Sequence, residues 1–190
     1  ISMLILGSQL NQTPVMSLQT GTQLAITGDP LVNPANLQIL AYKLEDSTSG
    51  AKQTELIRIA DIRELSKLGF IIDSIDEFIQ PTDVIKINEI YNLNFNLIDM
   101  KVIDQKNAKI GTITDFTIDL NTFTVQQLIV KRPILKSFND PELTIHRSQI
   151  TAVDDYKITI KTETEPTPKV KVKDAAPEAF TPNYVNPFRN

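Results

Sequence analysis

The sequence contains no cysteine, no tryptophan, one histidine and six glycines among its 190 residues. The absence of cysteine excludes disulfide bonds and thiolate chemistry, and it is compatible with a reducing compartment. A single histidine excludes a metal site built from several histidines. The scattered glycines form no loop of the kind that cradles phosphate groups. We therefore expect no cofactor, no metal site and no enzymatic activity.

Long hydrophobic runs and an excess of positive charge are also missing. No run approaches the roughly 18 apolar residues of a membrane-spanning helix, and the apolar run Met3–Leu6 is far shorter than a signal-peptide core. The net charge of -4 argues against the broad positive field that gives proteins sequence-independent affinity for nucleic acid. We expect a cytoplasmic protein without a transmembrane segment, and nucleic acid is not its expected ligand.

An internal repeat becomes visible when the sequence is shifted by 86 positions against itself. The shift lays Leu24–Leu44 over Ile110–Val130, and the apolar positions and the central turn largely coincide. With two further residues of shift, Ile57–Ile62 falls on Ile145–Ile150. Because the two matches occur in the same order, we interpret them as a duplication.

The second copy has the pattern of short β-strands. Around Asp115–Asp119 apolar and polar residues alternate, which places one set inward and the other toward water. A turn is predicted at Asp119–Thr122, a second strand at Phe123–Lys131, and a closing strand after a turn at Asp154–Asp155. In the first copy, spacings of three over Ala60–Gly69 predict a short helical turn that ends at the glycine.

The bridge and the C-terminal region differ in character from the copies. Pro81–Phe95 joins the copies, and its regularly spaced apolar residues predict a packed linker. From Glu163 the chain holds five of its eleven prolines, which excludes a long helix and predicts an extended, disordered tail. Its aromatic residues are candidate anchors for a partner: Phe180, Tyr184 and Phe188.

The carboxylates and the histidine are residues of this sequence that could act as general acids or bases. Asp115 and Asp119 lie four residues apart on one strand face, about 13 Å at the usual strand rise, which exceeds the spacing of paired catalytic carboxyl groups. A solvated face and a turn cap are the favoured interpretation. His146 has no ligand-like neighbours, so we expect a strand-end histidine that holds a loop by hydrogen bonds.

Two charged clusters remain. Asp73, Asp76 and Glu77 lack the ligand spacing of a calcium loop, so a solvated edge is favoured. The second cluster is predicted to form a small basic patch near one rim: Lys131, Arg132, Lys136 and Arg147. Without interleaved aromatic residues this patch gives only weak support for RNA binding.

Two segments of the second copy resemble a known family. They read "NLIDMKVIDQKNAKIGTITDFTIDLNTFTVQQLIVKRPIL" and "LTIHRSQITAVDDYKITIK". They are similar to the PRC-barrel domain, the small β-barrel shared by the cytoplasmic part of the photosynthetic reaction centre H subunit and the C-terminal domain of the ribosome maturation factor RimM. The resemblance runs from about Asn96 to Lys161. The first copy resembles the family less, because Ala25 stands in place of the hairpin glycine Gly111 and the following strand contains prolines.

The resemblance implies an all-β fold with two tandem PRC-type β-barrels and short helical turns. The expected boundaries are 1–90 for the first barrel, 91–162 for the second and 163–190 for the flexible tail. Barrels of this family act as adaptors, so the expected function is a non-enzymatic protein-interaction or scaffold module. The alternative is an RNA-processing or ribosome-maturation factor that binds a ribosomal protein.

The expected partner is therefore a protein. Its predicted contact regions are the Ser47–Gln53 loop, the groove between the copies and the aromatic tail. The individual residues predicted to contact it are Phe180, Tyr184, Phe188, Arg132 and Arg147. The oligomeric state is not predicted.

Overall fold

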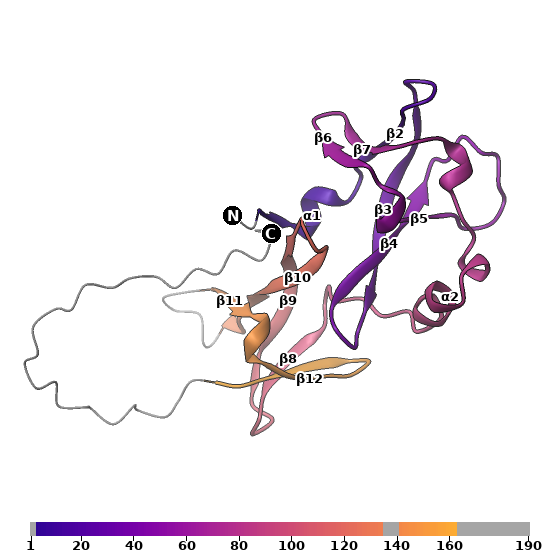
Figure 1. Ribbon diagram of the computed structural model, residues 1–190. Helices are drawn as coiled ribbons and strands as arrows, with labels where there is room; N and C mark the ends of the chain where they lie inside the picture. Colours follow the sequence, from indigo (N-terminus) through magenta and orange to yellow (C-terminus); the bar gives the residue numbers. More distant parts are fainter. Residues whose placement is uncertain (1–2, 135–140, 163–190) are drawn as a thin grey trace, which may run out of the picture.

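The computed structural model describes residues 3–134 and 141–162 (Figure 1). The all-β class is confirmed, because the strands of this part of the chain join into one 13-stranded sheet and the helices are short. The predicted tail lies outside the described residues, and so do its aromatic residues Phe180, Tyr184 and Phe188.

The elements fall into an N-terminal half, up to β7, and a C-terminal half from β8. The N-terminal half contains β1 (Leu4–Leu6), α1 (Gly7–Leu10), β2 (Pro14–Ser17), β3 (Gln23–Asn33), β4 (Gln38–Glu45), β5 (Leu56–Arg58), the 3-10 turn η1 (Ile59–Asp61), β6 (Glu64–Ser66) and β7 (Gly69–Ile72). The connection contains η2 (Ile75–Glu77), η3 (Pro81–Asp83) and α2 (Ile85–Asn92). The C-terminal half contains β8 (Lys101–Asp104), β9 (Lys109–Asp119), β10 (Thr124–Lys131), β11 (Glu142–His146), η5 (Arg147–Gln149), β12 (Ile150–Val153) and β13 (Lys157–Ile160).

The two halves present the same succession of elements. Their longest strands, β3 and β9, have 11 residues each, and the strands that follow, β4 and β10, have 8 residues each. In each half the first strand of this series pairs in parallel with the last, β2 with β7 and β8 with β13. The order of strands across the N-terminal half, β5-β4-β3-β2-β7-β6, is therefore that of β11-β10-β9-β8-β13-β12.

Neither half closes into a ring of paired strands. Within the described residues β5 has no ladder with β6, and β11 has none with β12. Each half is a curled open sheet whose edge strands are joined by a 3-10 turn, whereas the sequence led us to expect closed barrels. The strand class was thus predicted correctly, but the closure was not.

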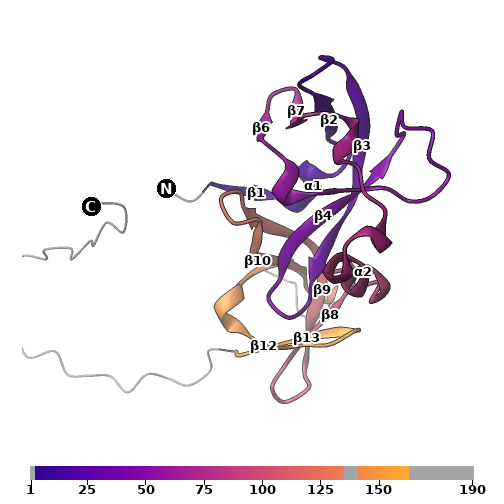
Figure 2. The same ribbon diagram turned by 45° about the vertical axis from the view of Figure 1, so that its right-hand side comes forward.

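The halves meet at the first residues of β4 and β10, near the centre of the molecule (Figures 1 and 2). Gln38 of β4 pairs with Thr124 of β10. The amide of Ile39 donates to the carbonyl oxygen of Phe123 at 2.8 Å, and the amide of Val125 donates to that of Leu37 at 3.0 Å. The two bonds are reciprocal, because Ile39 and Leu37 stand in the N-terminal half where Val125 and Phe123 stand in the C-terminal half. This junction has the arrangement of a two-fold interface.

One hydrophobic core extends through both halves. Side chains with exposures of 2% or less come from the N-terminal half, such as Ile39 and Phe70, and from the C-terminal half, such as Ile118 and Val125. Burial of apolar surface is the main favourable term in folding. Because the junction is part of the core, we expect the halves to behave as one body.

The turns at the tips of the two long hairpins are built alike. Asn33 accepts a hydrogen bond from the amide of Ala35 at 3.0 Å, and Asp119 accepts one from the amide of Asn121 at 2.9 Å. Leu37 and Phe123 close these turns with positive φ angles of 58° and 49°. The predicted role of Asp119 as a turn cap is confirmed.

The helical turn predicted over Ala60–Gly69 is largely wrong. Only η1 is helical, and β6 and β7 form a hairpin in which Leu65 pairs with Phe70. Gly69 has a φ of +118° and serves the hairpin turn rather than a helix end. Leu68 is 67% exposed, so the spacing of three did not describe one buried face.

The connection between the halves is packed, as predicted for Pro81–Phe95. Ile87 and Ile90 of α2 join a second, smaller core on the outer face of the N-terminal half, together with Leu31, Ala41 and Leu56. At the matching positions of the C-terminal half stand Thr117, Gln127 and Thr144. The outer face is apolar in the N-terminal half and polar at the matching positions of the C-terminal half, which explains why α2 packs on the N-terminal half (Figure 2).

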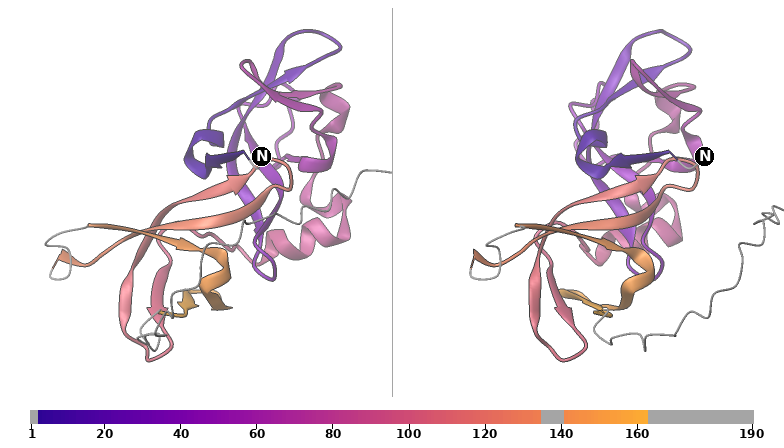
Figure 3. Two further views of the ribbon diagram at one scale, coloured as in Figure 1. Left: turned by 60° about the vertical axis from the view of Figure 1, so that its left-hand side comes forward. Right: turned by 90° about the vertical axis from the view of Figure 1, so that its left-hand side faces the viewer.

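The N-terminal segment crosses over to the C-terminal half. β1 pairs with β9, with Leu4 opposite Asp119 (Figure 3). Gly7 of α1 lies so close to Phe116 that an added Cβ would meet its ring at 2.5 Å. Asp115 accepts hydrogen bonds from the amide of Ser8, at 3.1 Å, and from its hydroxyl. Asp115 therefore holds α1 in place by hydrogen bonds. The prediction of a solvated face did not include this role.

Tyr42 gives a first testable prediction. Its side chain is fully buried, its hydroxyl finds no hydrogen-bond partner in the described structure, and burial raises the pKa of the phenol. A buried unpaired hydroxyl costs about 1–3 kcal/mol, so Tyr42→Phe should raise the free energy of unfolding by about 1 kcal/mol. Urea denaturation would measure the change. Tyr156→Phe, at a position 81% exposed, should have no effect, and a less stable Tyr42→Phe protein would contradict the prediction.

Candidate binding sites

The two arginines predicted to form one patch lie at different places. Arg147 belongs to η5 at the junction of the halves, whereas Arg132 follows the last residue of β10 at the outer end of the C-terminal half. Lys136, another predicted member, lies outside the described residues. The structure therefore divides the predicted patch into two candidate sites.

Arg147 holds the junction together. Its guanidinium donates to the carbonyl oxygen of Val125 in β10 at 2.9 Å and to that of Asn36 in the N-terminal half at 2.9 Å. Hydrogen bonds from a charged donor are stronger than neutral ones. Arg147 therefore has a structural role, in addition to the partner contact proposed from the sequence.

Two grooves flank the junction, and their linings correspond. One, of about 350 Å³, lies between the β3–β4 turn and the start of β12, and is lined by Pro34, Ala35, Asn36, Leu37, Arg147, Ile150, Thr151, Ala152 and Val153. The other, of about 380 Å³, lies between the β9–β10 turn and β6, and is lined by Ile59, Ile62, Arg63, Glu64, Leu65, Leu120, Asn121 and Phe123. In each groove the turn of one half faces the 3-10 turn of the other.

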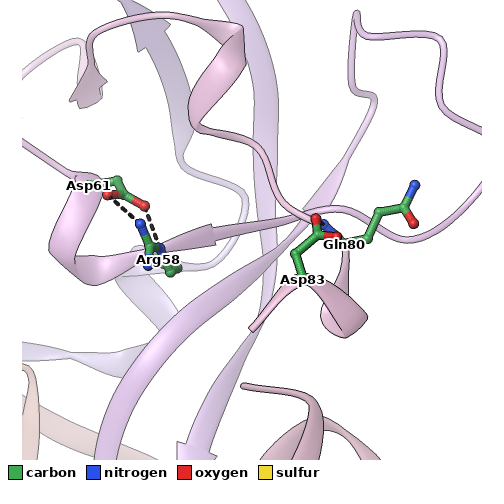
Figure 4. A network of polar contacts seen from close by, with 4 residues as sticks. All are labelled: Arg58, Asp61, Gln80 and Asp83. Carbon is green, nitrogen blue, oxygen red and sulfur yellow. Dashed lines mark hydrogen bonds and ion pairs between the residues drawn. The ribbon is translucent and has the colours of Figure 1, made fainter. Parts of the chain in front are cut away.

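The 3-10 turns beside these grooves are fixed by different chemistry. In η1 the guanidinium of Arg58 makes two bonds to the carboxylate of Asp61, at 2.6 and 3.0 Å (Figure 4). In η5 the amide of Ser148 donates to Nδ1 of His146 at 3.1 Å. The predicted role of His146, a strand-end histidine that holds a loop, is confirmed. The other contact in Figure 4, from the amide of Gln80 to Asp83, caps η3 just before α2.

A pocket of about 280 Å³ opens at the outer end of the C-terminal half. It is lined by Lys109, Ile110, Arg132, Leu143, Thr144, Ile145, Gln149, Ile160, Lys161 and Thr162. Four of these side chains are aliphatic and three are cationic. None of the described lining residues is acidic. The prediction from the sequence included Arg132 but missed Lys109 and Lys161.

The corresponding positions of the N-terminal half carry different charges. Lys109 begins β9, and Gln23 begins β3. Arg132 directly follows β10 and Lys161 directly follows β13, whereas Asp46 and Asp73 follow β4 and β7. The basic character of the pocket is therefore a property of the C-terminal half alone.

Asp73 gives a second prediction. Its carboxylate is paired with Arg63, and this hydrogen bond lowers the pKa of Asp73. A lowered pKa stabilises the fold above the ordinary pKa of an aspartate, and the contribution is lost as the pH falls through the lowered value. In a titration followed by NMR, Arg63→Gln should raise the pKa of Asp73 toward the ordinary range and leave that of Asp154 unchanged. An unchanged pKa of Asp73 would contradict the ion pair.

The Ser47–Gln53 loop is held by hydrogen bonds to Glu55, which follows it in the sequence. The hydroxyls of Ser47 and Ser49 each donate to the carboxylate of Glu55 at 2.6 Å.

Across residues 3–134 and 141–162 no cluster of three or more acidic or histidine side chains is placed to hold a metal ion. No helix in these ranges has the length and apolar character needed to cross a bilayer.

Comparison with known proteins supports the resemblance found in the sequence. Residues 92–162 match the family model of the PRC-barrel domain. The matched segment begins at the end of α2 and covers all strands of the C-terminal half. A search of curated proteins gives no match.

Proposed function

We propose that the chain is a non-enzymatic protein-interaction module of the PRC-barrel type, because residues 92–162 match the family model of that domain. We further propose that the N-terminal half is a second unit with the same plan, with boundaries at 1–90 and 91–162 followed by the tail at 163–190. The observation that carries the proposal is the reciprocal junction, which brings residues of both halves together in the walls of two concave grooves.

The N-terminal half supports a second unit in detail. Its longest strands have the same lengths as those of the C-terminal half, and the strand pairings follow the same order. The turn before β2 also matches the turn before β8. Gln12 and Asp99 have positive φ angles of 56° and 69°, and their amides donate to Thr27 and Ile113 at 2.7 and 2.9 Å. The two halves therefore agree in backbone conformation at this turn as well as in the pattern of their apolar residues.

Binding has to use the surface, because the interior is filled by side chains. The grooves beside the junction are concave, and their walls come from both halves. A partner seated in either groove would contact a β-turn and a 3-10 turn whose positions are fixed by backbone bonds. Such a surface loses little conformational entropy on binding, which favours affinity. We also propose a cytoplasmic location, which the lack of cysteine supports.

Affinity capture from the source organism tests this function. The wild-type chain would be compared with Ala152→Arg and Glu64→Arg, which place a bulky cation at matching positions of the two grooves, and with a chain lacking residues 163–190. Thr82→Arg, at an exposed position that lines neither groove, is the matched control. We expect at least one groove variant to lose a protein partner that the control retains.

Two outcomes would reject the proposal. If every partner is retained by both groove variants, by the shortened chain and by a chain in which Arg132 and Lys161 of the outer pocket are changed to aspartate, none of the proposed surfaces binds it. If capture depends on RNA, so that nuclease treatment removes the captured proteins, the alternative role in ribosome maturation is favoured instead.

A further inference from the structure

We propose that the pocket at the outer end of the C-terminal half, here called the basic pocket, binds an acidic peptide segment of a partner protein. An aliphatic side chain of that segment enters the cavity, and carboxylates beside it meet Arg132 and Lys161. The inference rests on the proposed function, since it assigns a class of ligand to one surface of an interaction module.

The basic pocket has an apolar floor that belongs to the core. Ile145 and Ile160 line it and are 1% and 2% exposed, so they are fixed by the packing beneath them. Ile110 and Leu143 also line the pocket and are only partly buried. An aliphatic side chain entering the cavity would cover apolar surface that is open to water, which is favourable by about 25 cal/mol per Å².

The rim of the basic pocket is positive. Arg132 and Lys161 form no side-chain hydrogen bond or ion pair with any described residue, and Lys109 stands at the start of the neighbouring strand β9. No aspartate or glutamate from the described ranges lines the pocket. Clefts lined by charges of one sign concentrate their field, so this one attracts anions although the whole chain has a net charge of -4.

The fold itself does not require this charge. The N-terminal half has Gln23, Asp46 and Asp73 at the three matching positions, and Asp73 is paired with Arg63. The residue that corresponds to Arg63 in the C-terminal half is Thr151, which donates to a backbone carbonyl instead. Three cations thus stand where the same backbone elsewhere carries two carboxylates and an amide.

The size and lining of the basic pocket favour a peptide over other anions. About 280 Å³ is slightly below the range of roughly 300–1,000 Å³ typical of small-molecule pockets, and it suits one anchoring side chain. None of its described lining residues is aromatic, so a nucleobase has no ring on which to stack. Arginine and lysine bind carboxylates through charge-assisted hydrogen bonds. An acidic segment with one aliphatic anchor meets all three conditions.

Selection from a random peptide library on the immobilised full chain tests the inference. Arg132→Asp/Lys161→Asp installs the residues of the N-terminal half at the same positions. Lys67→Asp/Lys86→Asp makes the same change of net charge at exposed positions outside the C-terminal half. We expect the wild-type chain to enrich peptides with acidic residues around a leucine, isoleucine or valine. A fluorescein-labelled peptide from the selection should bind the pocket variant at least about 20-fold more weakly, as the loss of two charge-assisted hydrogen bonds implies. It should bind the control variant within about twofold of wild type, as expected for charges distant from the site.

Several results would overturn the inference. The selection would do so if wild type and pocket variant enriched peptides equally, or if the enriched peptides lacked acidic residues. The binding assay would do so if a uridine oligonucleotide or anionic lipid vesicles displaced the labelled peptide at lower concentrations than the unlabelled peptide does. Binding that appears only when residues 163–190 are removed would also overturn it. If the selection fails while the groove variants still lose a partner in the capture experiment, the basic pocket is wrongly assigned and the interaction function stands. If both fail, the function itself is rejected.

Discussion

Replacing Gly69 with alanine should lower the free energy of unfolding by at least about 3 kcal/mol, because strained φ and overpacking each cost about 1–3 kcal/mol. Gly69 has a φ of +118°, and a Cβ there would lie 2.1 Å from the carbonyl oxygen of Pro14. That oxygen belongs to the backbone of β2, which pairs with β7, so it cannot move without disturbing the sheet. The change should weaken both halves together, although Gly69 lies in only one of them. Urea denaturation combined with hydrogen exchange would measure both effects.

Gly28→Ala is the matched control for this prediction. The three atoms nearest to a Cβ at Gly28 would all belong to the side chain of Glu45, whose carboxylate oxygen lies at 2.7 Å and can swing away. We expect a loss below about 1 kcal/mol, because the contacting atoms belong to a flexible side chain and not to the backbone. If Gly69→Ala accelerated exchange in the N-terminal half while β9 and β10 kept full protection, the halves would be independent and the shared core would be refuted.

Replacing Ile39 with alanine should cost about 3 kcal/mol, within the range of 2–5 kcal/mol for large-to-small changes in a core. Ile39 is 1% exposed, belongs to the core shared by both halves, and its amide binds Phe123 across the junction. Because the core at the junction contains side chains of both halves, a cavity at position 39 removes packing contacts from both. We expect a single unfolding transition, shifted to lower urea concentration when followed by probes in either half.

Val125→Ala, at the matching position across the junction, should produce a smaller shift of the same kind, since less buried apolar surface is removed. Ile85→Ala, at a position that is 80% exposed, should leave the midpoint unchanged. Two separate transitions in the Ile39→Ala protein, one for each half, would contradict the prediction.

The sequence predicted much of the local structure because short-range patterns carry it. The shift of 86 positions aligned the starts of β3 with β9 and of β4 with β10, and the alternation around Phe116 marked a true strand. The roles of His146 and Asp119 were also predictable, since both depend on neighbours within four residues. Closure of the sheet was not predictable in this way, because it depends on whether distant edges find each other.

The candidate site was only partly predictable for the same reason. Arg132 and Arg147 were grouped as basic residues of one sequence region, yet they belong to opposite ends of the β10–β11 pair. His146 pairs with Gln127, and Glu142 pairs with Lys131, which separates the two arginines by several steps of about 3.3 Å along the strands. Lys109 and Lys161 were missed because only the pairings of β8 with β9 and β13 bring them to the same end. Their contrast with Gln23 and Asp73 was visible in the aligned copies.

The reciprocal junction between β4 and β10 also bears on how such a surface can change over evolution. In a dimer of identical chains, every substitution appears twice, so a lysine that suits one site is imposed on the other. Here both sides of a two-fold arrangement lie in one chain, and each position can change alone. One end of the molecule can therefore become basic and the opposite end acidic without any change in backbone or core. The joined chain keeps one core shared by both halves and presents two different faces.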